Sequence, residues 1–470
     1  MSELTRLSAA RLAELIRKRE VSPVDAVEAY LSRIESLNPA LNAIVTLAPD
    51  AIERAKEMEA ALMRGDGTGA LYGVPVTVKD TFDVAGLRST SGSRLRAERI
   101  AGRDAQAVAG LRAAGAIILG KTNVPEMALT YDSDNPVFGR TNNPHDYSRT
   151  PGGSSGGCAA SVAASLSAAG LGSDLVGSIR IPAHFCGIFG LKPTSSAVSG
   201  MGHCPSMTGR LKQAAAFGPL ARSVEDLSLM FEALAGEASS AQWEVEESKS
   251  ARVAWYTHDG VRKVTEETAK AVEKAASALA DAGFEVVEAR PPGIERAPAL
   301  WSERFSPDVV EAMREVYRTR EDERKAGGAV RALLERSRDA PAKTEAERLV
   351  IDEECARLRH ALIEWMRERP LLLAPVGAVP AFKHGARKVS VEGEEMSVFN
   401  AFSYAQSFNT LDLPAACVPA ARTSEGLPIG VQLIGRPQSE RNLLKAARIL
   451  EEALGGFNRP PDSASTKSHN

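Results

Sequence analysis

The chain has 470 residues, of which 44% are hydrophobic and 25% are charged, a composition typical of folded globular proteins. A chain of this length can bury a large apolar core, so it needs neither disulfides nor a structural metal to fold. The formal net charge is -3 at pH 7, which gives no electrostatic reason to expect a nucleic-acid partner.

The cysteines also exclude some classes of protein. They are scattered, odd in number and part of no C-x-x-C or Cys/His cluster: Cys158, Cys186, Cys204, Cys355 and Cys417. This pattern argues against a disulfide framework or a zinc site and favours a reducing compartment. The first 20 residues lack the apolar core of a signal peptide, and no run of 18 apolar residues occurs. We therefore expect a cytoplasmic protein with no membrane partner and no metal.

Residues 1–65 are expected to form N-terminal helices that pack on the core. Two helices fit residues 8–36, the second capped by Ser22 and ended by Asn38-Pro39. A third helix fits residues 49–64.

Short apolar strands then alternate with helices, which is the pattern of an α/β fold. We expect a core formed by residues 66–235 and completed by residues 371–455. The expected strands are 73–79, 116–119, 252–256, 284–287, 371–374, 416–418 and 429–434, and the expected helices are 104–114, 265–282 and 439–453.

Residues 236–370 are expected to form a variable α/β and helical region. Within them, residues 290–368 are dense in charge and poor in strand signals, and Ser306-Pro307 has the pattern of a helix start. The polar, Pro- and Ser-rich tail 456–470 is expected to be disordered.

The most unusual segment is Thr150-Pro-Gly-Gly-Ser-Ser-Gly-Gly-Cys158. Taken alone, it is compatible with a flexible Gly/Ser linker. A phosphate-binding loop fits poorly, because no Lys-Ser/Thr pair follows the glycines. The G-x-S-x-G pattern of a nucleophile elbow also fits formally, but a loop precedes Ser154 where that motif needs a strand. Lys79, at the end of an expected strand, would ordinarily be a solvated charge.

Together with two further segments, this region resembles the amidase signature family. The matching motifs are Gly-Gly-Ser-Ser-Gly-Gly around Ser154, Gly-Ser-Asp-Leu-Val-Gly-Ser-Ile-Arg around Ser178, and Gly-Val-Pro-Val-Thr-Val-Lys before Asp80. The resemblance covers roughly residues 1–235 and 370–455. It implies an amidase-signature fold, in which helices cover both faces of a large mixed β-sheet, with a variable helical region.

The resemblance also implies a Ser–cisSer–Lys catalytic triad. Ser178 corresponds to the nucleophile, Ser154 to the bridging serine after a cis peptide bond, and Lys79 to the general base. A lysine can act as a base only when neutral, and burial lowers its pKa in the required direction. No histidine is then needed for catalysis.

In the same family, the backbone N–H groups before and at the nucleophile form the oxyanion hole. These belong here to Leu175, Val176, Gly177 and Ser178. Val176 stands where the family pattern has a glycine. If this position needs a positive φ, a β-branched residue would be strained there. We take Val176 as a determinant of specificity that narrows the space near the acyl carbon.

Further residues flank these motifs. Asp412 also occupies a position that is often glycine in the family. Asp174 and Arg180 are expected to form a structural ion pair beside the nucleophile.

Trp301, Phe305, Val309, Met313 and Tyr317 recur every four residues, as on one face of a helix. This face could line an apolar acyl or aryl pocket or simply belong to the core. We expect Met127, Tyr131, Trp301 and Phe305 at the substrate pocket.

The resemblance therefore predicts an amidase that hydrolyses linear carboxylic amides through an acyl-enzyme without a cofactor. Esters and carbamates (urethanes) share an attackable carbonyl and are plausible further substrates. The alternative is the A subunit of a glutamine-dependent tRNA amidotransferase, which liberates ammonia from glutamine within a complex. A non-catalytic scaffold is a third hypothesis. We expect a small-molecule substrate and a monomer or homodimer.

Overall fold

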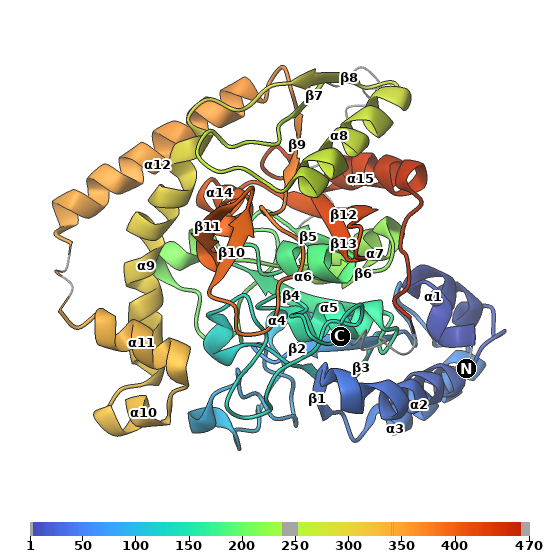
Figure 1. The fold of residues 1–470 in the computed structure, drawn as a ribbon. Coiled ribbons are helices and arrows are strands. Elements are labelled where there is room, and N and C mark those ends of the chain that lie inside the picture. The colour runs from blue at the N-terminus through green and yellow to red at the C-terminus, as the bar shows by residue number, and fades with distance from the viewer. Residues whose placement is uncertain (1–2, 237–251, 340, 342, 462–470) are drawn as a thin grey trace, which may run out of the picture.

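The computed structural model describes residues 3–236, 252–339, 341 and 343–461. In these ranges, eleven strands form one mixed sheet in the order β1-β3-β2-β4-β6-β5-β12-β13-β9-β7-β8, and two more form a hairpin (Figure 1). The strands of the sheet are β1 Ile44–Leu47, β2 Pro75–Lys79, β3 Ile117–Thr122, β4 Ala169–Asp174, β5 Phe189–Lys192, β6 Ala216–Ala221, β7 Arg252–Trp255, β8 Glu285–Glu288, β9 Leu371–Pro375, β12 Ala415–Arg422 and β13 Pro428–Gly435, and the hairpin is β10 Lys388–Val391 with β11 Glu394–Ser397.

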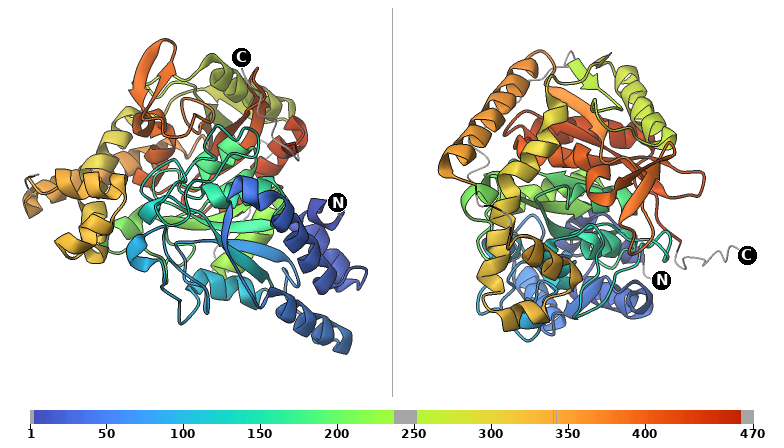
Figure 2. Two further views of the ribbon diagram at one scale, coloured as in Figure 1. Left: turned by 60° about the horizontal axis from the view of Figure 1, so that its bottom comes forward. Right: turned by 60° about the vertical axis from the view of Figure 1, so that its left-hand side comes forward.

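Helices connect the strands and cover the sheet. They are α1 Ala9–Arg17, α2 Pro23–Leu41, α3 Ala51–Arg64, α4 Gln106–Ala113, α5 Gly156–Ala163, α6 Arg180–Cys186, α7 Val224–Ala235, α8 Glu266–Asp281, α9 Ala297–Val316, α10 Arg320–Lys325, α11 Gly328–Arg336, α12 Glu345–Trp365, α13 Val398–Ala401, α14 Ser403–Thr410 and α15 Glu440–Leu454. Helices α9–α12 lie on the opposite side of the molecule from α1–α3 (Figure 2).

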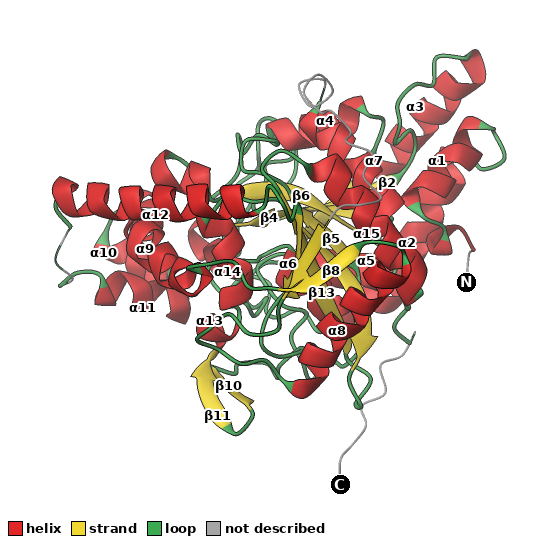
Figure 3. Ribbon diagram, turned by 90° about the horizontal axis from the view of Figure 1, so that it is seen from above, coloured by secondary structure: helices red, strands yellow, loops and turns green. Residues whose placement is uncertain are grey.

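Both faces of the sheet are buried, because successive strand residues point to opposite faces. In β9, Leu371 and Leu373 belong to the apolar cluster shared with α7, α8 and α15, whereas Leu372 and Ala374 belong to the cluster shared with α5, α6 and α14. Helices therefore flank both faces, as Figure 3 shows. This confirms the α/β fold class that the motifs implied.

The sheet runs across the expected domain boundaries. Strand β1 belongs to the N-terminal segment expected to be helical, and it pairs with β3. Strands β7 and β8 belong to the region expected to be variable, and β7 pairs in parallel with β9 of the C-terminal part. The expected disorder of the tail concerns mainly residues 462–470, which lie outside the described residues.

Two expected helix ends are corrected by the structure. Helix α2 does not stop at Asn38-Pro39 but continues to Leu41, where Asn42 in the left-handed conformation (φ 52°) donates its N–H to the Asn38 carbonyl. Helix α9 begins at Ala297 and not at Ser306-Pro307, and Pro307 lies inside it. Its start is favoured by Pro298 in the first turn, where a missing N–H costs nothing.

Among the described helices, none is both long enough and apolar enough to span a bilayer.

Candidate active site

Lys79 ends strand β2 and is fully buried. Its Nζ lies 2.7 Å from Ser154 Oγ, 2.9 Å from Ser173 Oγ and 3.3 Å from the Ser173 carbonyl oxygen. Strands β2 and β4 are parallel neighbours, so the residues at their carboxyl ends meet at one edge of the sheet. Burial lowers the pKa of the Lys79 amine to about 7, because the charged ammonium loses its hydration. A large fraction of Lys79 is therefore neutral near pH 7.

Ser154 follows a cis peptide bond from Gly153 and lies just before helix α5. The surrounding glycines are required by packing. A Cβ at Gly153 would lie 2.5 Å from the Thr130 carbonyl oxygen, and a Cβ at Gly157 would lie 2.4 Å from the Asn123 nitrogen. Residues 150–163 are buried throughout. The segment is thus a packed loop and helix and not a flexible linker.

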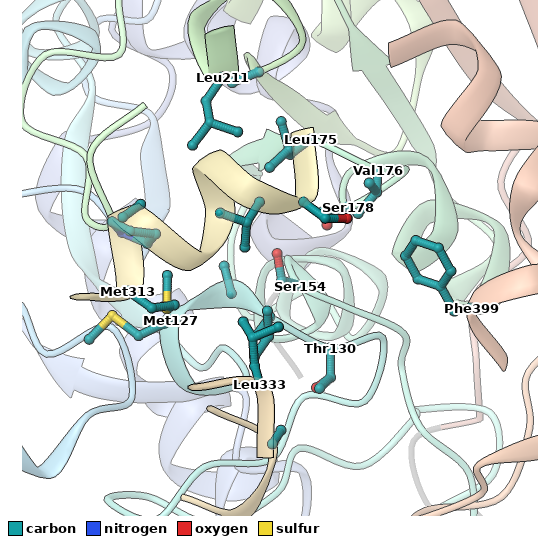
Figure 4. Close-up of a pocket in the computed structure, with 18 of the residues that line it drawn as sticks. Met127, Thr130, Ser154, Leu175, Val176, Ser178, Leu211, Met313, Leu333 and Phe399 are labelled. Carbon is teal, nitrogen blue, oxygen red and sulfur yellow. The ribbon is translucent and has the colours of Figure 1, made fainter. Parts of the chain in front are cut away.

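Ser178 lies in the turn between β4 and α6 and is 4% exposed. Its hydroxyl and that of Ser154 both face the same pocket, close to one another (Figure 4). The backbone of Ser178 is held by a hydrogen bond from the Ser155 N–H to its carbonyl. The structure therefore brings Lys79, Ser154 and Ser178 together from three distant parts of the sequence.

Among the backbone N–H groups of residues 175–178, one forms a hydrogen bond within the protein. The Gly177 N–H donates to the Asp174 carboxylate at 2.7 Å. The N–H groups of Leu175, Val176 and Ser178 have no hydrogen-bond partner among the described residues. These three groups are free to bind an oxyanion, whereas Gly177 is not free in this conformation.

The glycine of this loop is required at position 177 and not at position 176. Gly177 has a φ of 100°, and a Cβ there would lie 2.7 Å from Ile181 and 2.8 Å from Ala405. Val176 does not have a positive φ, so its β-branched side chain is not strained. Asp412, at the other departure from the family pattern, does have a positive φ of 47°, which aspartate tolerates better than most residues.

Asp174 and Arg180 form a fully buried ion pair. Both carboxylate oxygens lie 3.1 Å from guanidinium nitrogens, and Arg180 also donates to Gln432 and Asn409. Burial alone would raise the pKa of the Asp174 carboxyl, but the Arg180 guanidinium holds it well below its usual range. The pair therefore fixes the loop that carries Ser178.

A cavity of about 680 Å³ opens above the two serines. Most of its lining is apolar, and helix α9 closes one side, where the Trp301 indole N–H donates to the Leu175 carbonyl at 3.1 Å. The apolar side chains of the lining include Met127, Leu175, Val176, Met207, Leu211, Phe217, Trp301, Val309, Met313, Leu333 and Phe399.

Two of the four residues expected at the pocket do not line it. Met127 and Trp301 do, but Phe305 faces the core and is fully buried. Tyr131 lies behind the cavity: its hydroxyl donates to the Val176 carbonyl at 2.8 Å, and its ring stacks with Phe399 at 6.2 Å. Periodicity along a helix identifies one face but does not separate its cavity-lining positions from its core positions.

Sequence reasoning missed two residues of the site. Ser173 contacts Lys79 directly, and His203 Nε2 lies 3.1 Å from Ser173 Oγ. Ser173 stands in the Gly-Ser-Asp motif and could have been singled out there. His203 belongs to no motif, and only the fold brings it to the site.

The nucleophile-elbow hypothesis finds no support in the geometry. Residues 123–153, directly before Ser154, contain no strand, and the partner of Ser154 is Lys79. No group of three His, Cys, Asp or Glu side chains able to hold a metal occurs in the described part of the chain.

Comparison with known proteins agrees with this geometry. A family model described as Amidase matches residues 25–444. The chain is 34% identical to the A subunit of the glutamyl-tRNA(Gln) amidotransferase of Nitratidesulfovibrio vulgaris, with 98% of this chain and 99% of that protein covered. It is 32% identical to fatty-acid amide hydrolase 2-A from Danio rerio, with 97% and 90% covered.

A solved structure of a bacterial aryl acylamidase of the amidase signature family superposes with a TM-score of 0.83 at 26% identity, with 96% of this chain and 97% of that chain covered. The chain therefore belongs to the amidase signature family, whose named members here include hydrolases of amides.

Proposed function

We propose that this protein is an amidase that hydrolyses linear carboxylic amides with an apolar acyl or aryl group through a serine acyl-enzyme. The observation that carries the proposal is the contact of the buried Lys79 amine with Ser154 at the base of a large apolar cavity. A base next to a serine supports nucleophilic catalysis, and the lining suits apolar substrates.

In the proposed reaction, Ser178 Oγ attacks the carbonyl carbon of the amide. Its proton passes to Ser154 Oγ while the Ser154 proton passes to the neutral Lys79 amine. The negative charge that forms on the carbonyl oxygen is stabilised by the free N–H groups of the loop before Ser178.

The tetrahedral intermediate then collapses as the carbon–nitrogen bond breaks. The proton on Lys79 returns through Ser154 to the leaving nitrogen, which departs as a neutral amine. Water attacks the acyl-enzyme with the same proton relay, which releases the carboxylic acid and regenerates Ser178. Esters and carbamates have carbonyl carbons that the same steps would attack, and we propose them as secondary substrates.

A second candidate function is supported by the similarity to the amidotransferase protein. A protein of that function would release ammonia from glutamine, which is a small polar substrate. The apolar lining of the cavity favours a larger apolar substrate, and for this reason the stand-alone amidase is our first proposal. We also propose that the protein acts in the cytoplasm as a monomer or homodimer, without nucleic-acid or membrane partners.

The experiment that tests the proposal is a hydrolysis panel with the purified chain. Acyl p-nitroanilides, simple aliphatic amides, aryl esters, aryl carbamates and glutamine would be compared by kcat/KM. We expect the anilides and apolar amides to be hydrolysed, and glutamine not. Release of ammonia from glutamine alone would overturn the proposal and favour the amidotransferase function.

A further inference from the structure

The hydrogen-bond network of Lys79 continues beyond the three residues of the proposed triad. Ser173 Oγ lies 2.9 Å from Lys79 Nζ and 3.1 Å from His203 Nε2, and His203 Nδ1 lies 2.8 Å from the Pro205 carbonyl oxygen. His203 is largely buried, with Phe82 and Phe217 against its ring. Lys79, Ser173 and His203 thus form a chain that ends on a backbone carbonyl.

The direction of each hydrogen bond in this chain follows from its last member. A carbonyl oxygen can only accept, so His203 Nδ1 must carry the hydrogen that it donates to Pro205. Burial lowers the pKa of His203 to about 3, so the ring is neutral and its Nε2 carries a lone pair. This lone pair accepts the hydroxyl hydrogen of Ser173. Ser173 Oγ is then left with lone pairs for Lys79.

This arrangement restricts the orientation of the Lys79 amine. A neutral amine has two hydrogens and one lone pair. The Oγ and carbonyl oxygens of Ser173 can accept both hydrogens, at 2.9 and 3.3 Å. The lone pair is then directed at Ser154 Oγ, 2.7 Å away.

We propose that His203 is a positioning residue that, through Ser173, directs the lone pair of the Lys79 amine toward Ser154. Without an acceptor at His203 Nε2, the Ser173 hydroxyl can donate to Lys79 and occupy the lone pair that the reaction needs. The proposal rests on the proposed function, in which Lys79 is the base.

The other ionisable groups around the chain do not replace His203. The Asp174 carboxylate acts on Lys79 through its charge, and the Asp83 carboxylate acts on His203, whereas the Cys158 thiol near Lys79 is neutral because burial raises its pKa to about 11. Asp174 is paired with Arg180, and none of these three groups hydrogen-bonds to the Ser173 hydroxyl among the described contacts.

A double-mutant cycle tests the proposal. In His203→Leu, we expect kcat/KM for an acyl p-nitroanilide to fall at least about tenfold, since a hydrogen bond is lost and the base is also misdirected. In His203→Gln, whose amide oxygen can take the place of Nε2, we expect most of the rate to return. In a Ser173→Ala background, His203→Leu should change the rate less than about twofold.

The pH profile separates positioning from a change in basicity. A misdirected neutral amine is not corrected by removing a proton, so the loss in His203→Leu should persist at pH 9. Recovery of the wild-type kcat/KM at high pH would overturn the proposal. So would an equal fall in kcat/KM on His203→Leu in the wild-type and the Ser173→Ala backgrounds. A second comparison replaces His203→Leu if circular dichroism shows that this variant does not fold. In that case kcat/KM of His203→Gln should still exceed kcat/KM of His203→Asn, whose shorter amide does not reach Ser173. Equal values of kcat/KM in these two variants would contradict the proposal. If the wild type cleaves no amide, the proposed function itself fails.

A separate observation concerns charge at the cavity. The charged side chains of its lining are Asp174, Arg336 and Arg387. Asp174 is neutralised by Arg180, whereas Arg336 and Arg387 are exposed and form no ion pair with any described residue. A mostly apolar cavity thus carries two cationic groups that have no ion-pair partner among the described residues.

We infer that the preferred amide has an apolar body that ends in an anionic group such as a carboxylate. This inference deepens the proposed function and depends on it. The two guanidinium groups come from α11 and from the loop before β10, and both can attract an anion at the solvent-exposed part of the cavity. Because they are exposed, the attraction is screened by salt.

A matched pair of substrates tests the inference: the p-nitroanilide of suberic acid with its free carboxylate, and the analogue with a methyl group in place of that carboxylate. We expect kcat/KM to favour the acid about fivefold at low salt, and the ratio to fall in 0.5 M NaCl and in R336A/R387A. A ratio of one or less in the wild type, or a ratio unchanged in the variant, would overturn the inference. If neither anilide is cleaved, the proposed function fails instead.

Discussion

Lys79 is a basic residue in a fully buried position, and its burial opposes folding while it favours catalysis. To be neutral at pH 7, the amine must give up the proton that it holds in the unfolded chain, where its pKa is near 10.4. This costs on the order of 4 kcal/mol at neutral pH. The cost decreases as the pH rises toward 10, because the unfolded chain also loses the proton.

Replacing this residue should therefore separate stability from activity. In Lys79→Met, we expect the thermal midpoint at pH 7 to rise and amide hydrolysis to disappear, since an apolar side chain of similar length has no proton to lose. Differential scanning calorimetry at pH 7 and pH 9.5 measures the effect. The stabilisation should be larger at pH 7, and a lower midpoint at both pH values would contradict the burial cost.

Ser178 and Ser154 have different roles in the proposed reaction, and their variants should differ. Ser178→Ala should lower kcat by at least about 10⁴-fold and abolish labelling by a fluorophosphonate probe, because the attacking oxygen is gone. Ser154→Ala should also have a low kcat, but the probe should still label it at Ser178, whose hydroxyl is present. Mass spectrometry of the labelled peptide distinguishes the two, and labelling at Ser154 in the wild type would contradict the roles.

The loop between β4 and α6 is fixed by Asp174, which accepts from Arg180 and from the N–H groups of Gly177 and Ile179. Asp174→Ala leaves the Arg180 guanidinium buried and unpaired. We expect a loss of about 3–5 kcal/mol in the free energy of unfolding, measured by urea denaturation. A loss below about 1 kcal/mol would show that the pair contributes little to the loop.

The same loop presents Val176 to the cavity. Its isopropyl group takes up space next to Ser178, so Val176→Gly should raise the relative kcat/KM for bulky, branched acyl anilides over linear ones. A control at Phe305, which does not line the cavity, should leave the order of preference among acyl groups as it is. An unchanged substrate profile in Val176→Gly would argue that the side chain does not limit the pocket.

At the scale of the whole molecule, the cavity belongs to two parts of the chain. The segment around Ser178, which follows strand β4, supplies one part, while α9, between β8 and β9, supplies Trp301, Val309 and Met313. The Trp301 hydrogen bond to Leu175 joins the two parts directly at the loop of the nucleophile. One wall of the cavity is therefore set by the region in which no sequence motif resembled the family, although the family model spans it.

The sequence predicted seven of the eleven strands of the sheet from local apolar patterns, and the resemblance to the family implied the three central residues. It did not predict β1, β4, β5 or β6. It did not predict that Phe305 lies outside the cavity, since that depends on how α9 packs against the core. Nor did it predict the same for Tyr131, which bonds to the Val176 carbonyl and packs on Phe399. Nor did it predict helix α5, whose Gly- and Ser-rich sequence has weak helix propensity and is stabilised by tertiary packing. His203 reaches the site only through a loop that no local pattern describes.

The pH dependence of kcat/KM reports on the protonation of Lys79, which the fold as a whole sets by burying the amine. Only the neutral amine can accept a proton, so we expect kcat/KM for a neutral anilide to rise with pH through a midpoint of about 7 and to be constant above it. A profile that is flat between pH 5.5 and 9, or that falls across this range, would contradict the claim that the buried lysine is the base.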